Sequence, residues 1–122
     1  FHVIVPPEPV LVVIENGIIV DAPDAPESFT KVLDQIRADE QLWVRELGFG
    51  MNRAMTRHRR LTDIGSYERM FGIHLSIGQK HTIYTKEGFP KRSSKYHVDV
   101  FAAITTVMID GEVVYKDGGY CV

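Results

Sequence analysis

The fold of this chain is decided by the stretch Val10-Leu11-Val12-Val13-Ile14-Glu15-Asn16-Gly17-Ile18-Ile19-Val20-Asp21. Its two runs, Val10–Ile14 and Gly17–Asp21, are rich in the β-branched side chains that favour strands. They meet at Asn16-Gly17, a dipeptide that tolerates the positive φ angles of a two-residue hairpin turn. The sequence therefore predicts a β-hairpin close to its start.

A second hairpin is predicted close to the end of the sequence. Tyr96–Ile109 and Glu112–Tyr115 read as strands and are joined by Asp110-Gly111, another dipeptide typical of tight turns. Exposed edges of such hairpins tend to be covered by pairing with another chain, so we expect a homodimer.

The residues between the hairpins predict helices and two more strands. Apolar side chains recur at intervals of three and four from Phe29 to Ile36, which indicates a helix with Pro26 in its first turn and Asp24 or a neighbour as its cap. The other expected elements are a strand over Leu42–Leu47, a short helix over Asp63–Met70 capped by Asp63 or Ser66, a strand over Phe71–Ile77 and a surface loop over Gly78–Lys95. We expect a single α+β domain over residues 1–122, with a mainly antiparallel sheet, hairpins at both ends and one or two short helices.

Composition and charge exclude several functional classes. The chain is 44% hydrophobic and 25% charged, as in an average soluble globular protein. Its net charge of −2 does not indicate a nucleic-acid or membrane partner. No apolar stretch approaches the roughly 20 residues that span a bilayer. A single cysteine, Cys121, permits no disulfide within the chain and favours a cytoplasmic location.

Four residues could carry metal chemistry. His97 and Asp99 are two apart on a predicted strand, so their side chains project from the same face. An imidazole and a carboxylate suit zinc, cobalt, manganese or iron. Glu46 at the end of one apolar strand and His74 inside another would complete a set of two carboxylates and two imidazoles. For each residue taken singly, a solvated strand face or a buried, hydrogen-bonded histidine is the alternative interpretation.

The segments around these four residues resemble the metal-site motifs of the aminopeptidase T and S family, in the same order and with similar spacing. The resembling segments are Glu46–Asn52, Tyr67–Gly78 and Tyr96–Asp99, and the closing Val107–Gly118 hairpin is also similar. The resemblance covers most of the chain from about Val10. It implies that the four residues help hold two divalent metals, which in that family activate a water molecule against the N-terminal peptide bond.

The sequence also departs from that family. The family has a further metal-binding glutamate upstream of the segment matching Glu46, and a separate N-terminal domain, and neither occurs here. The first residue is Phe1 and not methionine, which suggests that the sequence begins inside a longer chain or that its start has been trimmed. Where the family has a tyrosine beyond the motif histidine, this sequence has His81, with Tyr84 close by.

Three residues are predicted to bind substrate, namely Arg53, His81 and Tyr84. Arg53 begins an arginine cluster that ends at Arg60 and could hold a carboxylate or a phosphate by bidentate contacts. A solvated surface is the other interpretation of this cluster.

Two functions follow from the motifs and the departures. The first is a truncated, aminopeptidase-like domain that binds a peptide, for example by strand addition, as an accessory factor in the maturation of a precursor peptide. The second is a divalent-metal-dependent aminopeptidase, or a fragment of one. In the first case the metal site could be vestigial or empty.

Overall fold

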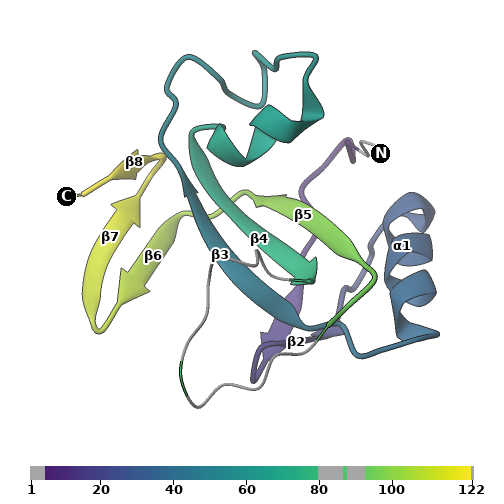
Figure 1. Cartoon of the computed structure of the whole chain (residues 1–122). Helices are drawn as coiled ribbons and strands as arrows, with labels where there is room; N and C mark the ends of the chain where they lie inside the picture. Colours follow the sequence, from purple (N-terminus) through teal and green to yellow (C-terminus); the bar gives the residue numbers. More distant parts are fainter. Residues whose placement is uncertain (1–4, 80–86, 88–92, 122) are drawn as a thin grey trace. The chain divides into compact units, whose positions relative to one another are not determined.

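The computed structural model describes residues 5–79, 87 and 93–121. The elements in these residues are, in chain order, β1 Val13–Glu15, β2 Ile18–Asp21, α1 Glu27–Arg37, β3 Val44–Gly50, η1 Ile64–Arg69, β4 Gly72–Gly78, β5 His97–Ala102, β6 Thr106–Ile109, β7 Glu112–Lys116 and β8 Gly119–Tyr120 (Figure 1). This composition of hairpins and strands with a short α-helix and a 3-10 helix confirms the predicted α+β class, with a low helix content.

The strands belong to three small sheets. β1 pairs with β2, the strands β3, β4 and β5 follow one another in that order, and β7 lies between β6 and β8. The β1–β2, β6–β7 and β7–β8 pairs are antiparallel. Contacts divide the chain into two compact units, a first unit of residues 1–47 and 75–99 and a second unit of residues 48–74 and 100–122.

The hairpin that opens the first unit is confirmed. Asn16 and Gly17 have φ angles of 51° and 77°, so both central residues of the turn are left-handed, as the Asn-Gly pair predicts. The turn and the second strand of the hairpin make hydrogen bonds with the start of β3 and with a residue just before it. Ile19 N–H donates a hydrogen bond to the Leu42 carbonyl oxygen at 3.0 Å, and Val44 N–H donates one to the Gly17 carbonyl oxygen at 2.8 Å. The hairpin is thereby bonded to the residues that lead into β3.

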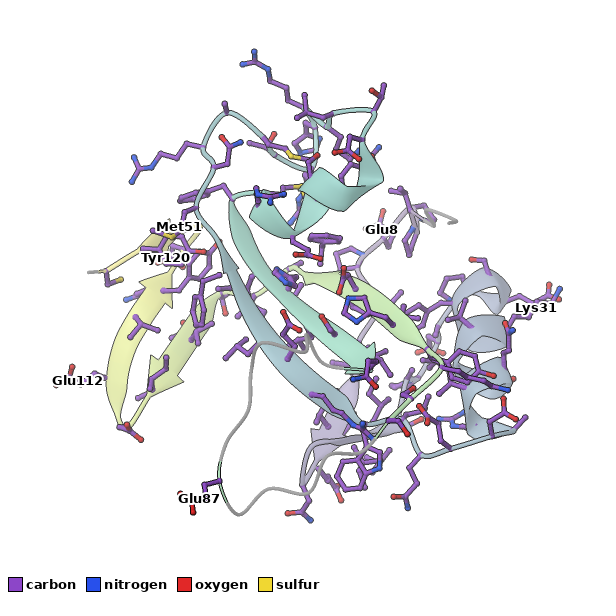
Figure 2. The ribbon with its side chains drawn as sticks, in the orientation of Figure 1. Glu8, Lys31, Met51, Glu87, Glu112 and Tyr120 are labelled. Atoms are coloured by element: carbon purple, nitrogen blue, oxygen red, sulfur yellow. The ribbon has the colours of Figure 1, made fainter. Side chains whose placement is uncertain are left out.

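The helix α1 is also confirmed, although its cap differs from the prediction. Leu33 and Ile36 are each 1% exposed, on the predicted apolar face. Pro26 is itself the N-cap, no side chain caps the helix, and Asp24 has a left-handed φ of 57° two residues earlier. Figure 2 shows Lys31 projecting outward from this helix. Neither helix of the described residues has the length and apolar character needed to cross a bilayer.

The predicted single strand Tyr96–Ile109 is wrong in its extent, because it is two strands, β5 and β6, in different sheets. The residues between them, 103–105, have no proline, glycine or charge that would mark a break in the sequence. The break coincides with a distant contact in the second unit, in which Asp117 N–H donates to the Thr105 carbonyl at 2.8 Å. A local pattern could not reveal that bond.

The hairpin predicted near the end of the sequence is confirmed. Asp110 and Gly111 have φ angles of 51° and 86°, and they join β6 to β7. A further turn, Asp117-Gly118, has the same left-handed pair of angles, 46° and 85°, and adds the unpredicted strand β8. Glu112 projects from the tip of the β6–β7 hairpin in Figure 2.

The strand predicted over Leu42–Leu47 begins later and ends later, since β3 runs to Gly50. The glycines expected to end the strand are instead sites of close packing within the second unit. A Cβ atom on Gly50 would lie 1.6 Å from the Met70 carbonyl oxygen, and one on Gly48 would lie 1.9 Å from the His74 ring. Glycine continues the strand here because no side chain would fit.

The short helix predicted over Asp63–Met70 is present as the 3-10 helix η1. The Asp63 side chain accepts a hydrogen bond from Gly65 N–H at 3.1 Å, which confirms Asp63 as the cap. Gly78–Lys95, the predicted surface loop, lies largely outside the described residues.

The aromatic cluster of the second unit is centred on Tyr120. Its ring packs edge to face on Phe71 and Tyr115, each with centroids 5.2 Å apart. Its hydroxyl lies 2.9 Å from the carbonyl oxygens of Gly50 and Gly72, to which it donates. Burial is the main reason why the pKa of Tyr120 lies above its ordinary value. This cluster anchors the C-terminal hairpin strand to the second unit.

Candidate metal centre

The strand β5 presents His97 and Asp99 on one face, as expected for residues two apart on a strand. His97 Nε2 lies 3.3 Å from Asp99 Oδ1. The His97 side chain is 41% exposed and that of Asp99 is 22% exposed, so the pair is open to solvent on one side. These are the two predicted ligands that the first unit brings into contact.

The orientation of the His97 ring is set by a backbone carbonyl. His97 Nδ1 lies 2.6 Å from the carbonyl oxygen of Gln79, which can only accept a hydrogen bond. Nδ1 therefore carries a proton, and in the neutral ring Nε2 presents a lone pair toward Asp99. A histidine that donates one ring N–H to a carbonyl and turns its other nitrogen outward has the usual arrangement of a metal ligand.

The orientation of the Asp99 carboxylate is set by a buried hydroxyl. Ser76 Oγ donates to Asp99 Oδ1 at 2.6 Å, and Ser76 on the central strand β4 is only 1% exposed. A buried donor of this kind is held by its surroundings, so the carboxylate oxygen that faces His97 has a fixed position. Both side chains of the pair are thus oriented by a hydrogen bond to another residue.

The donor pair fits a transition metal in chemistry and in spacing. Nitrogen and oxygen ligands about 2.0–2.2 Å from one zinc-like ion lie about 3.0–3.5 Å apart in tetrahedral or octahedral geometry. The observed separation of 3.3 Å falls in this range. A lone pair on Nε2 facing a carboxylate oxygen also needs a cation between them, either a metal ion or a second proton on the ring. Zinc, cobalt and manganese all accept such ligands.

The start of β5 is held against the C-terminal end of α1 (Figure 1). Tyr96 donates hydrogen bonds to the Asp39 carboxylate and, at 3.2 Å, to the Gln35 carbonyl. Lys95 Nζ lies 2.7 Å from the same Asp39 carboxylate. This exposed network fixes the residues that directly precede His97.

The Asp39 network should make stability depend on pH. Hydrogen bonds from Lys95 and then Tyr96 lower the pKa of Asp39 below 3.8, while the bond to Asp39 raises the pKa values of Lys95 and Tyr96. The Asp39 contribution is therefore present above its unfolded pKa and lost as the pH falls through the folded one, and the Lys95 contribution is lost at strongly alkaline pH. We expect Asp39→Asn to lower the free energy of unfolding at neutral pH.

Below a pH of about 4, the free energies of unfolding of wild type and Asp39→Asn should begin to converge, and they should meet below the folded pKa of Asp39. Urea unfolding followed by Trp43 fluorescence across the acid range measures this difference. Glu15→Gln, in the exposed β1–β2 hairpin, is the control. A difference between wild type and Asp39→Asn that is constant with pH would contradict the assigned role.

His74 lies in the second unit, buried in β4 with 5% exposure. Its ring packs on the backbone of Gly48 and on the Phe101 ring, whose centroid is 5.8 Å away. Among the described residues its Nδ1 atom has no hydrogen-bond partner. Glu46 lies half-buried on β3, in the part of that strand that belongs to the first unit. Of the four predicted ligands, His97 and Asp99 are therefore the two for which the structure gives a direct contact within one unit.

Glu68 is a candidate ligand that the sequence analysis missed. It is an exposed carboxylate of the kind that divalent metals accept as a ligand. Glu68 belongs to the second unit, so the fit described above rests on the pair in the first unit alone. The only signal for Glu68 in the sequence is its place in the Tyr67–Gly78 segment.

Of the three predicted substrate-binding residues, Arg53 is described and exposed. Its guanidinium carbon lies 5.4 Å from the centroid of the Phe71 ring. His81 and Tyr84 lie outside the described residues.

The chain was compared with protein-family models, with curated proteins and with solved structures. None of the three comparisons finds a match. The resemblance to the aminopeptidase T and S motifs consequently stays a prediction drawn from short segments of this sequence.

Proposed function

We propose that this chain is a cytoplasmic peptide-binding protein, built like the metal-site half of an aminopeptidase T or S and holding a divalent cation on His97 and Asp99. The observation that supports the proposal is the way in which both side chains are oriented, one by the Gln79 carbonyl and the other by buried Ser76. When bound, the cation would supply a Lewis acid for the amine or carbonyl of a peptide.

Peptide binding is favoured over catalysis because the site is open. The His97 side chain is 41% exposed to solvent. Electrostatic stabilisation of a transition state is strong where water is excluded, and an exposed ligand pair offers little of it. β5 is also the last strand in the order β3-β4-β5, so among the described strands its outer edge is available for strand addition by an extended peptide.

A metal-dependent aminopeptidase is the second candidate. The observation that favours it is that His97 and Asp99 leave coordination positions open, which catalytic zinc sites keep for water or substrate. This candidate predicts release of the N-terminal residue, which the peptide-binding proposal does not.

A labelled peptide with a free N-terminus tests both candidates. We expect its affinity, measured by fluorescence anisotropy, to rise about tenfold when Zn²⁺ replaces a chelator, as loss of a metal-coordinating contact typically costs this much or more. The acetylated peptide and the His97→Ala protein are the controls, and neither should show the gain. Equal affinity with and without metal would refute the proposal. Metal-dependent appearance of the free N-terminal amino acid, measured by chromatography, would establish the aminopeptidase instead.

A further inference from the structure

A loop joins β3 to η1 (Figure 1), and its sequence concentrates positive charge. Residues 51–62 contain no acidic side chain, and their basic residues are Arg53, Arg57, His58, Arg59 and Arg60. The rest of the chain has ten lysines and arginines against all sixteen acidic residues, a formal charge of −6 with neutral histidines. The charge of this loop, which we term the arginine loop, is therefore opposite to that of the remaining sequence.

The arginine loop has a defined turn at its tip. Thr56 and Arg59 exchange backbone hydrogen bonds of 3.1 and 3.0 Å, which leaves Arg57 and His58 as the two residues of the turn. Met55, directly before this turn, is 2% exposed, and its carbonyl accepts a hydrogen bond from Phe71 N–H at 3.0 Å. A buried anchor at its base holds the exposed arginines in place, and this lowers the entropy that binding would cost.

Among the described residues, the arginines of the loop have no acidic partner. Arg53 lies over the Phe71 ring, and none of the four guanidinium groups forms an ion pair within the part of the chain that the structure describes. Elsewhere in the chain, Lys31 and Lys95 each lie less than 3 Å from a carboxylate. Guanidinium groups that no described carboxylate engages can make bidentate contacts with carboxylates of a ligand.

Apolar side chains flank the arginines. Met51 before them is 65% exposed, and Leu61 after them is 56% exposed. Met51 is labelled in Figure 2. Exposed methionine and leucine beside a charged surface favour a ligand that also has apolar side chains.

We propose that the arginine loop binds an acidic peptide segment whose carboxylates are interspersed with apolar residues. The acidic segment and the free N-terminus bound at the metal site would belong to one peptide. This link rests on the proposed function. The charge of the loop, the exposure of its arginines and their lack of ion pairs with the described residues do not depend on the proposed function.

A peptide fits the loop better than a nucleic acid does. A nucleic acid is a long polyanion, and the −6 charge of the remaining sequence would repel it beyond the few residues of the loop. A short acidic segment carries its charge over a length comparable to the loop. Met51 and Leu61 also have no role in contacts with phosphate groups.

The test uses a short fluorescent peptide of alternating glutamate and leucine, acetylated at its N-terminus, with a chelator present. Because this probe has no free amine and no metal is available, its result is independent of the proposed metal site. We expect binding that weakens as salt rises. The protein with Arg57→Gln, Arg59→Gln and Arg60→Gln together should bind about tenfold more weakly or worse, since three charged contacts are lost.

Matched controls separate the loop from general charge effects. Protein with Lys31→Gln, Arg37→Gln and Lys116→Gln loses the same charge elsewhere and should bind like wild type. A probe with glutamine in place of glutamate should not bind. Circular dichroism confirms that both triple variants are folded. Equal loss in the two variants, no binding by wild type, or tighter binding of a single-stranded oligonucleotide of equal charge would each overturn the proposal.

Discussion

Replacement of His97 by alanine should reduce the affinity of the protein for Zn²⁺ by roughly a hundredfold or more, because a direct ligand contributes more than the ~10–100-fold typical of outer partners. The expectation rests on the 3.3 Å separation of His97 Nε2 from Asp99 Oδ1, which suits two ligands of one ion. Isothermal titration calorimetry in the presence of a competing chelator measures the change.

A graded series makes this test specific. Ser76→Ala should weaken Zn²⁺ binding about tenfold, since its hydroxyl only orients Asp99. His58→Ala removes an exposed histidine elsewhere and should leave the affinity unchanged. If His97→Ala binds Zn²⁺ as wild type does, the cation would lie elsewhere and the metal centre would be refuted.

Replacement of Gly50 by alanine should destabilise the protein by about 3 kcal/mol or more, at the upper end of the cost of overpacking. The new Cβ would lie 1.6 Å from the Met70 carbonyl oxygen. This oxygen belongs to the backbone next to Arg69, whose own carbonyl accepts a 3.0 Å hydrogen bond from Asn52 N–H, so the chain cannot shift without loss of pairing. Urea unfolding followed by circular dichroism measures the free energy.

Gly119→Ala is the matched control for Gly50→Ala. A Cβ at Gly119 would lie 3.8 Å from its closest neighbour, which is ordinary van der Waals contact, and this glycine does not have a positive φ. We expect its effect to stay within about 0.5 kcal/mol, as for most surface substitutions. Similar losses in both variants would show that the close packing at Gly50 is not what stabilises the strand.

The candidate metal centre shows how much of a site residue spacing alone can predict. The pairing of His97 with Asp99 could be predicted because both lie on one strand, where side chains alternate with a period of two. Ser76 and the Gln79 carbonyl could not be predicted as their partners, since they come from a different part of the chain. Their contact depends on which strands are neighbours and in which register, and local periodicity contains neither.

By itself, the sequence determined the two hairpin turns and the buried face of α1. Asn16-Gly17 and Asp110-Gly111 adopt left-handed angles for reasons internal to each dipeptide, so their effect is local. The tertiary structure alone decided where the long apolar stretch Tyr96–Ile109 breaks. It also decided that β3 continues through its glycines and that a buried hydroxyl supports Asp99. Each of these outcomes depends on an atom distant in the chain that approaches within contact distance, and a local pattern does not encode that approach.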